Sequence, residues 1–516
     1  MKKIYLLITV LALTATACDK DYISLLPEDS LSPETFYQTD DQLASAALAA
    51  YVPLRDVLLN DHFASEMHAD NTHYQPAPNN RGTANVHRES GADWNNDGNN
   101  TYINSIYFHC YTGISRANIL IGRIPNAARA TEAGKAKADG QAKFIRALNY
   151  FKLVRLFGDV PLHLTEVTKA EEAFLPRASV DEVYAQIISD CQDAIAQLEP
   201  PAKFPQSGEA TKGAATVLLA DVYVTLKRYE EAEALLNTLP DMGYKLITTS
   251  YEDVFKPTNK NNEESLFEVQ YQTVTGTGSQ PNIVPFQFLP RTPNTVLITG
   301  APFSNTVGSG GWNKPVQDLI DAYEEGDARL EASIAVAEGT YDDSYVMTIS
   351  ANKSVVNYTP EEGKVGQPYS KKFLHPPFEL AGNSSTNWPI YRYAEALLLL
   401  AEALNEQGKS PLGPLNAVRN RAGLGNITET NKEVLRDLIF HERRVELAFE
   451  NKRFHDLQRN PRGLEIMQAY AIKAKATYPL LPPTAFDIQP YKFLLPIPQP
   501  ERGLNPALTQ NPGYSF

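Results

Sequence analysis

Cysteine is scarce in this sequence, and the few cysteines present do not predict a disulfide bond. Of the 3 cysteines, Cys18 lies near the N-terminus, whereas Cys110 and Cys191 lie far apart in the chain. Each of the latter two sits in an apolar stretch with helical spacing. We therefore expect both to be buried free thiols, with a disulfide pair as the less favoured alternative.

Basic charge and long apolar runs are also in short supply. The chain has 47 lysines and arginines against 61 acidic residues, and its formal net charge is −14. This balance argues against a nucleic-acid partner, because phosphate binding needs a basic face. Beyond the N-terminus there is no uninterrupted run of about 18 apolar residues, the length that would predict a membrane-spanning helix.

Sequence patterns of catalysis are missing as well. The chain has no nucleophile elbow, no phosphate-binding loop and no pair of carboxylates set in an expected cleft. Glycoside hydrolysis would need such a pair at a fixed separation. The acidic residues Glu442, Glu446 and Glu450 follow one another at helical spacing beside apolar neighbours, which favours interhelical salt bridges over catalysis. We expect a protein that is not an enzyme.

The N-terminus carries a secretory signal. Lys2 and Lys3 precede an apolar run and then the small residues that lead to Cys18, in MKKIYLLITVLALTATAC. This segment resembles a bacterial lipoprotein signal, which implies cleavage of residues 1–17 and lipidation of Cys18. An ordinary signal peptide with an unrelated cysteine is the alternative. Acidic residues directly after Cys18 resemble the signal that sends lipoproteins of the Bacteroidota to the cell surface.

A long helix predicted over residues 137–157 organises the chain. Its apolar side chains cover most of the helix circumference, so we expect it to be buried among other helices. Its polar residues, such as Arg146 and Lys152, recur every third position and either snorkel or pair with buried carboxylates. Gly158 and Pro161 predict the end of the helix.

Further helices are predicted around it, several of them in pairs. Residues 211–226 and 229–239 show tetratricopeptide-like spacing, with Lys227 where that repeat often has glycine. Helix pairs of this kind stack to bury a shared core. The sequence therefore predicts a mostly α fold built as a tetratricopeptide-like scaffold with irregular loops and a few short strands. The remaining helices are expected over residues 40–59, 101–124, 181–198, 392–407, 414–422 and 432–459.

Two regions break the helical pattern and supply the candidate ligand-binding residues. Residues 60–100 are rich in asparagine, aspartate, glycine and histidine, and residues 240–390 combine short strands with loops. Sugar binding needs flat aromatic rings flanked by planar hydrogen-bonding groups. Packing against the scaffold is the alternative for every aromatic. The candidates are Asp70, Asn71, Tyr74, Arg81, Trp94, Phe288, Arg291 and Trp312.

A calcium loop is a further hypothesis for residues 93–104. Asp93, Asn95 and Asp97, followed by Gly98, match the opening of such a loop. The glutamate expected at the twelfth position is replaced by Asn104, so a site here would be weak. An asparagine-rich turn without metal is the alternative, and we expect no other cofactor.

Ordered stretches along the chain resemble the SusD/RagB family of outer-membrane nutrient-binding lipoproteins. Two of them lie in the N-terminal half, QAKFIRALNYFKLVRLFGDVPL at 141–162 and LPRASVDEVYAQIISDCQDAIAQL at 175–198. Others are WPIYRYAEALLLLAEALNEQG at 388–408, LNAVRNRAGL at 415–424, HERRVELAFENKRFHDLQR at 441–459 and FLLPIPQPERGLNPALTQNPGY at 493–514.

This resemblance implies a lipid-anchored outer-membrane protein facing the cell surface. It also implies a SusC-like TonB-dependent transporter as partner and an oligosaccharide as ligand. The expected organisation is a signal peptide (1–17), a lipidated tether (18–35) and one SusD-like domain (36–516) whose ligand-binding loops lie at about 240–390. A peptide ligand is the first alternative, and a surface hydrolase is a weaker one.

Overall fold

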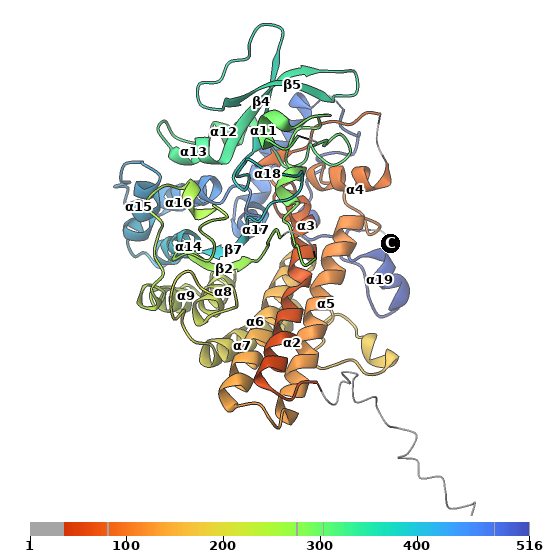
Figure 1. The fold of residues 1–516 in the computed structure, drawn as a ribbon, viewed down its shortest axis with the longest axis vertical. Coiled ribbons are helices and arrows are strands. Elements are labelled where there is room, and N and C mark those ends of the chain that lie inside the picture. The colour runs from red at the N-terminus through yellow and green to blue at the C-terminus, as the bar shows by residue number, and fades with distance from the viewer. Residues whose placement is uncertain (1–35, 80–81, 275–276, 303, 479, 515–516) are drawn as a thin grey trace, which may run out of the picture.

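The computed structural model describes residues 36–79, 82–274, 277–302, 304–478 and 480–514. The expected signal peptide, Cys18 and the tether lie outside these residues, as does Arg81. Helices dominate the described part, with a small three-stranded sheet at one end (Figure 1). None of the described helices is long and apolar enough to cross a membrane. The predicted mostly α fold is confirmed.

Helix α6 (Glu132–Phe157) is the central element, as predicted, although it begins five residues earlier. Thr131 caps its first turn by accepting a hydrogen bond from the amide of Gly134. The helix packs against α5 (Thr101–Arg123) and α7 (Val180–Gln197) and is buried on most sides. Its polar residues pair with buried carboxylates: Arg146 binds Asp190 at 2.7 and 2.8 Å.

The helix predicted over residues 40–59 is wrong as a single element. The structure has α2 (Asp40–Tyr51) and α3 (Pro53–Ser65), which meet at Val52. Proline has no amide hydrogen to donate and clashes with the preceding turn, so Pro53 starts a new helix.

Tetratricopeptide-like pairs form the second half of the scaffold, as predicted. Helices α8 (Lys212–Thr225) and α9 (Tyr229–Leu236) pack on α14 (Tyr393–Glu406), which packs in turn on α15 (Leu412–Arg421) and α16 (Lys432–Glu446). Cys191 and Cys110 are buried free thiols, also as predicted.

In the part of the chain that the structure describes, the strands form three small antiparallel sheets. Strand β1 (Thr72–His73) pairs with β3 (Lys314–Pro315), and β2 (Ser265–Val269) pairs with β7 (Trp388–Arg392). The third sheet has the order β5–β4–β6. Its strands are β4 (Ile334–Tyr341), β5 (Met347–Ser354) and β6 (Val365–Ser370).

Short helices lie in the loops that join the longer helices and the strands. The α-helical ones are α4 (Thr83–Ala92), α10 (Val284–Gln287), α11 (Val296–Thr299), α12 (Gln317–Ile320) and α13 (Ala328–Ser333). The 3₁₀ turns are η2 (Ile124–Asn126), η3 (Ala170–Ala173), η4 (Pro240–Met242), η5 (Glu252–Val254) and η6 (Pro490–Phe493).

The helix predicted over residues 432–459 is also interrupted. Helix α16 ends at Glu446, and α17 (Arg453–Arg459) starts after a turn in which Phe449 and Asn451 have positive φ. Both backbone amides donate to the carboxylate of Glu66, at 3.0 and 3.1 Å. A carboxylate more than 380 residues away therefore shapes this turn, which local spacing could not reveal.

Two helices near the C-terminus complete the fold. Helix α18 (Gly463–Thr477) was not predicted, and α19 (Gln499–Leu504) lies within the proline-rich tail. The tail runs along the end of α6, where the amide of Leu495 donates to the carbonyl of Leu156 at 2.6 Å. The Asn511 side chain donates to the Phe157 carbonyl at 2.9 Å.

A buried network of ion pairs joins the loop-rich segment to the scaffold. The Glu446 carboxylate accepts hydrogen bonds from Arg329, Arg392 and Arg421. Arg392 also binds Glu264 at 2.9 Å and Glu450 at 2.8 Å. These side chains are at most 1% exposed. The interhelical salt bridges predicted for the acidic residues of α16 are thus confirmed.

At the centre of this network, the neighbouring positive charges affect the pKa of Glu446 more strongly than burial does. Burial raises the pKa of Glu446, but the guanidinium groups of Arg421, Arg392 and Arg329 hold that pKa well below its ordinary value. The carboxylate is therefore ionised and paired throughout the neutral range.

Replacing the carboxylate should destabilise the protein. We expect Glu446→Ala to lower the free energy of unfolding by about 3–5 kcal/mol, because three guanidinium groups lose a buried partner. Denaturant unfolding measures this. Glu465→Ala is the control: its pair with Arg462 is exposed, so its effect should stay within about 0.5 kcal/mol. Equal losses in the two variants would contradict the assignment.

The contribution of the Glu446 carboxylate to the free energy of unfolding should disappear at low pH. Because the pKa of Glu446 is lower in the folded than in the unfolded state, its stabilisation is present above pH 4.5 and lost as the pH falls below it. The stability difference between wild type and Glu446→Gln should shrink by roughly 2 kcal/mol between pH 7 and pH 3. A difference that stays constant with pH would show that Glu446 is not the paired anion.

Candidate functional site

The predicted ligand residues Asp70 and Asn71 are committed to the scaffold. Asp70 binds Arg453 at 2.6 and 2.8 Å, and Asn71 accepts from Arg444 at 2.8 Å while donating to Glu66 at 2.9 Å. Burial raises the pKa of Asp70, but Arg444 and Arg453 outweigh it and hold the pKa well below its ordinary value. Both side chains hold the loop after α3 against α16 and α17.

Trp94 and Tyr74 lie in the interior. The Trp94 indole is fully buried and stacks on His68 with 4.1 Å between ring centroids. Phe493 of the C-terminal tail contacts it edge-on at 5.0 Å. Tyr74 donates its hydroxyl to Asp93 at 3.0 Å. Neither ring offers a face to a ligand in this structure.

The second predicted group is buried as well. Phe288 is 1% exposed, and Trp312 is 6% exposed and packs edge-on against Phe63 at 5.4 Å. Arg291 donates to the carbonyls of Pro76 at 2.7 Å and Val307 at 3.0 Å. Trp312, which follows the glycine-rich stretch 308–311, therefore points into the protein interior.

Trp94, Trp312, Tyr74 and Phe288 are thus all buried, which agrees with packing against the scaffold, the alternative given for every aromatic. The rings of Tyr74 and Trp312 do lie near each other, with 6.3 Å between their centroids, but in the interior of the protein. Burying a large aromatic side chain is strongly favourable, and this gain can exceed the conformational entropy lost when a loop becomes ordered. A long loop can therefore contribute its rings to the hydrophobic core.

The calcium hypothesis meets a competing set of contacts. The buried Asp93 carboxylate accepts from Tyr74 and lies 3.4 Å from His73. Asp97 uses its carboxylate to accept from the backbone amide of Asn99 at 2.8 Å, and Asn95 is exposed. Throughout the described ranges, no group of three or more histidine, cysteine, aspartate or glutamate residues is placed to hold a metal ion.

A partly exposed pair of aromatic rings lies at the β4–β5 turn. The rings of Tyr341 and Tyr345 are 6.0 Å apart and tilted by 43°, and both are partly exposed. The Tyr341 hydroxyl donates to Gln367 on β6. Tyr345 has a positive φ of 54°, which is uncommon for a residue with a side chain and marks a position worth a functional explanation.

The turn is fixed to the loop that was predicted to bind ligand. Asp342 closes it by accepting from the amides of Ser344 and Val346 at 2.8 and 2.9 Å. The Gln75 side chain donates to the Tyr345 carbonyl, and Asn79 donates to the Ser344 hydroxyl at 2.8 Å. We call the surface formed by Tyr341, Tyr345, Asn79, Asp342 and Asp343 the tyrosine rim.

Sequence reasoning missed the tyrosine rim. Its only signal is Tyr341 and Tyr345 at either end of a polar Asp-Asp-Ser turn, a spacing that many unrelated turns share. The rim combines two partly exposed rings with planar amides and carboxylates, which is the chemistry that sugar binding requires.

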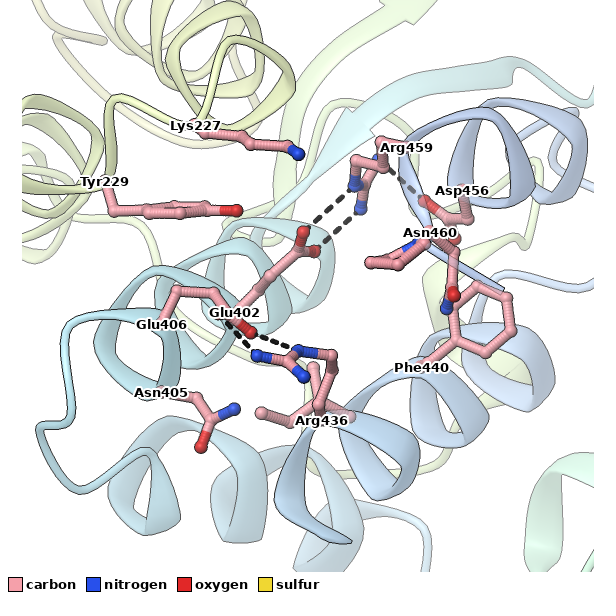
Figure 2. A pocket seen from close by; sticks show the side chains of 12 residues that line it. Lys227, Tyr229, Glu402, Asn405, Glu406, Arg436, Phe440, Asp456, Arg459 and Asn460 are labelled. Atoms are coloured by element: carbon pink, nitrogen blue, oxygen red, sulfur yellow. Dashed lines mark hydrogen bonds and ion pairs between the residues drawn. The ribbon is translucent and has the colours of Figure 1, made fainter. Parts of the chain in front are cut away.

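A separate pocket lies between the helix pairs of the scaffold (Figure 2). It has a volume of about 240 Å³ and is lined by residues of α14, α16 and α17 and of the turn between α8 and α9. Glu402 forms a two-pronged pair with Arg459 at 2.9 and 3.1 Å, and Glu406 pairs with Arg436. We call it the helix-pair pocket.

Lys227 and Tyr229 stand at the wall opposite these ion pairs (Figure 2). Lys227 adopts φ 59° in the α8–α9 turn, at the position where sequence spacing suggested glycine. Tyr229 begins α9, and burial raises its pKa to about 12, so its hydroxyl stays protonated. Of the charged residues lining the helix-pair pocket, Glu402 and Asp456 pair with Arg459, and Glu406 pairs with Arg436.

Substituting Trp94 tests its structural role. Trp94→Ala should lower the free energy of unfolding by about 3–5 kcal/mol, because it empties a fully buried site between His68 and Phe493. Chemical denaturation measures the loss, with Phe108→Ala as control because Phe108 is 55% exposed. A stable Trp94→Ala protein that loses ligand binding would instead restore Trp94 as a ligand contact.

Comparison with known proteins places the chain in a family. Residues 263–514 match the family described as the SusD family, and residues 21–224 match one described as starch-binding and associating with the outer membrane. The chain resembles the SusD-like protein P2 of Formosa agariphila, with 30% identity over 552 residues and full coverage of both chains.

Two further likenesses involve proteins named for a carbohydrate. A solved laminarin-binding SusD-like protein shares 25% identity and a TM-score of 0.72, covering 93% of this chain and 100% of its own. The starch-binding protein SusD of Bacteroides thetaiotaomicron is 23% identical over 436 residues, or 74% of each chain. With full-length similarity at 30% identity, this chain belongs to the SusD family.

Proposed function

We propose that this chain is a non-catalytic, lipid-anchored protein of the cell surface that binds oligosaccharide and delivers it to a SusC-like TonB-dependent transporter. Membership of the SusD family supports the carbohydrate part of the proposal. One relative of the chain is named for laminarin and another for starch, and both names describe binding rather than catalysis.

The observation that carries the proposal is the tyrosine rim. Tyr341 and Tyr345 are partly exposed on a turn that two polar contacts fix to the 75–79 loop. A rigid, partly exposed ring pair loses little conformational entropy when a pyranose packs on it. Neighbouring exposed side chains, Asn79, Asp342 and Asp343, can then hydrogen-bond the sugar hydroxyls.

The anchoring and delivery steps rest on other grounds. The lipoprotein signal ending at Cys18 supports attachment to a membrane, and the family description of the N-terminal half mentions association with the outer membrane. A lipid anchor with more than one acyl chain holds a protein firmly at a membrane. The transporter partner follows from the family resemblance, and co-purification from solubilised membranes would test it.

Removing a tyrosine from the rim should weaken sugar binding. We expect the soluble chain starting at residue 19 to bind at least one member of a neutral oligosaccharide panel that includes laminarin and starch fragments. Tyr345→Ala should lower that affinity about tenfold, as loss of a central aromatic contact does, whereas Tyr345→Phe should retain it. Isothermal titration calorimetry measures both.

Tyr358→Ala is the matched control. Tyr358 is also partly exposed but follows β5 at its far end, away from the 342–346 turn, so its loss should leave affinity unchanged. Undiminished binding by Tyr345→Ala and Tyr341→Ala would show that the rim is not the site. If no oligosaccharide binds but basic peptides do, in a salt-sensitive way, the proposed ligand class is wrong.

A further inference from the structure

A second cavity adjoins the helix-pair pocket. It has a volume of about 300 Å³, and Phe440 of α16, labelled in Figure 2, lines both spaces. Residues of α16, α17 and α18 form its walls, with Ile466, Ala469 and Tyr470 of α18 supplying apolar surface. Asp70 and Asp318 reach it from the loop-rich part of the chain. We call it the Arg453 pocket.

The Arg453 pocket is rich in basic side chains, although the whole chain has a net charge of −14. Arg444, Arg453, Arg462 and Lys473 line it, against three acidic residues, Asp70, Asp318 and Glu465. Two of the cations are well exposed: the side chain of Arg462 is 54% exposed and that of Lys473 is 66% exposed. Each has an acidic partner: Arg462 lies 3.0 Å from Asp437, and Lys473 lies 2.5 Å from Asp318, so an anionic ligand would share these cations with carboxylates.

Arg453 supplies an unused hydrogen-bond donor. Its side chain is 4% exposed, and its Nε and Nη2 atoms donate to Asp70. Its Nη1 atom has no hydrogen-bond partner in the part of the chain that the structure describes. The guanidinium carbon lies 4.2 Å from the centre of the Phe440 ring. A buried, charged N–H group without a partner is costly, so native proteins usually satisfy it with an acceptor.

His441 adds a second donor at the same cavity. Its ring lines the pocket and makes no hydrogen bond to any residue within the described ranges. Burial lowers the pKa of His441, and Arg444 lowers it further, so the imidazole is neutral at pH 7 and can donate one N–H. Arg453 and His441 therefore line the cavity, and the exposed, ion-paired cations Arg462 and Lys473 lie at its edge.

We propose that the Arg453 pocket binds the anionic group, a carboxylate or a sulfate ester, of an acidic saccharide. Guanidinium groups recognise both anions through charge-assisted hydrogen bonds. The apolar surface of Tyr470 and Ile466 suits the carbon-bound face of a sugar ring. Phe440 lines both this cavity and the helix-pair pocket, so an adjoining sugar would meet the same ring. The inference rests on the proposed saccharide function and adds a second site with a charge preference.

Substitutions that change one charge at the edge of the Arg453 pocket test this proposal without removing buried residues. The soluble chain from residue 19 is titrated with an oligouronate, a sulfated oligosaccharide, a neutral oligosaccharide of equal length and inorganic sulfate. Lys473→Ala should lower the affinity for the acidic saccharides about fivefold, and Asp318→Asn should raise it by a similar factor, because each changes one charge at the cavity.

The chain offers a matched control for each substitution. Lys475→Ala removes an exposed lysine from the same helix, and Asp321→Asn neutralises an exposed acid near Asp318, but neither residue lines the cavity. Both controls should leave the affinity unchanged, and all four variants should bind the neutral saccharide like wild type. Whichever acidic saccharide responds to Lys473→Ala and Asp318→Asn identifies the anion as carboxylate or sulfate.

Three results would overturn the inference. Equal affinity for neutral and acidic saccharides would show that the cavity takes no anion. Binding of inorganic sulfate as tight as that of the saccharides would make the cavity a site for free anions. If Lys473→Ala and Lys475→Ala lowered the affinity for acidic saccharides equally, the preference would come from the overall charge of the protein and not from the cavity. Neutral-sugar binding that depends on Tyr345 would still uphold the proposed function, so the two proposals can fail separately.

Discussion

The buried ion network around Glu446 is the constraint on which the rest of this structure depends. It joins the end of α16 to the starts of α13 and α14 and to the end of α15, through Arg329, Arg392 and Arg421. Arg392 extends it to Glu264 at the start of β2. A buried ion pair stabilises a protein only when the attraction between the charges exceeds the cost of removing them from water, which requires short distances and several partners. The charges of this network meet both conditions.

The network has a consequence for the surface. It holds β2, β7 and α13 against the helical scaffold, and α13 leads directly into β4. Strand β4 carries Tyr341 at its end, so the tyrosine rim is supported by rigid elements although it lies on a turn. Contacts from Gln75 and Asn79 then fix the turn to the loop after β1. A binding surface positioned in this way can be specific without large rearrangement.

Sequence reasoning succeeded where the information is local. The long buried helix and the paired helices follow from spacing within about twenty residues, and the structure has both. The breaks at Pro53 and after Glu446 were missed for different reasons. The first needs only the proline rule, whereas the second depends on Glu66, which is distant in sequence.

The candidate site could not be predicted in the same way. Trp94 and Trp312 lie on loops, but whether a loop ring faces solvent is decided by its tertiary neighbours, here Phe493 and Phe63. The partly exposed Tyr345 has little to distinguish it in sequence. Family membership, in contrast, was visible in the sequence, because scaffold motifs spread over the chain carry it.

Hydrogen exchange in the presence of a bound oligosaccharide tests the central claim most directly. The account predicts slower amide exchange in residues 340–347 and 75–79, where the tyrosine rim meets the loop after β1, and no change in the buried helix α6. Protection confined to other segments, with exchange at the rim unaltered by saturating sugar, would contradict it.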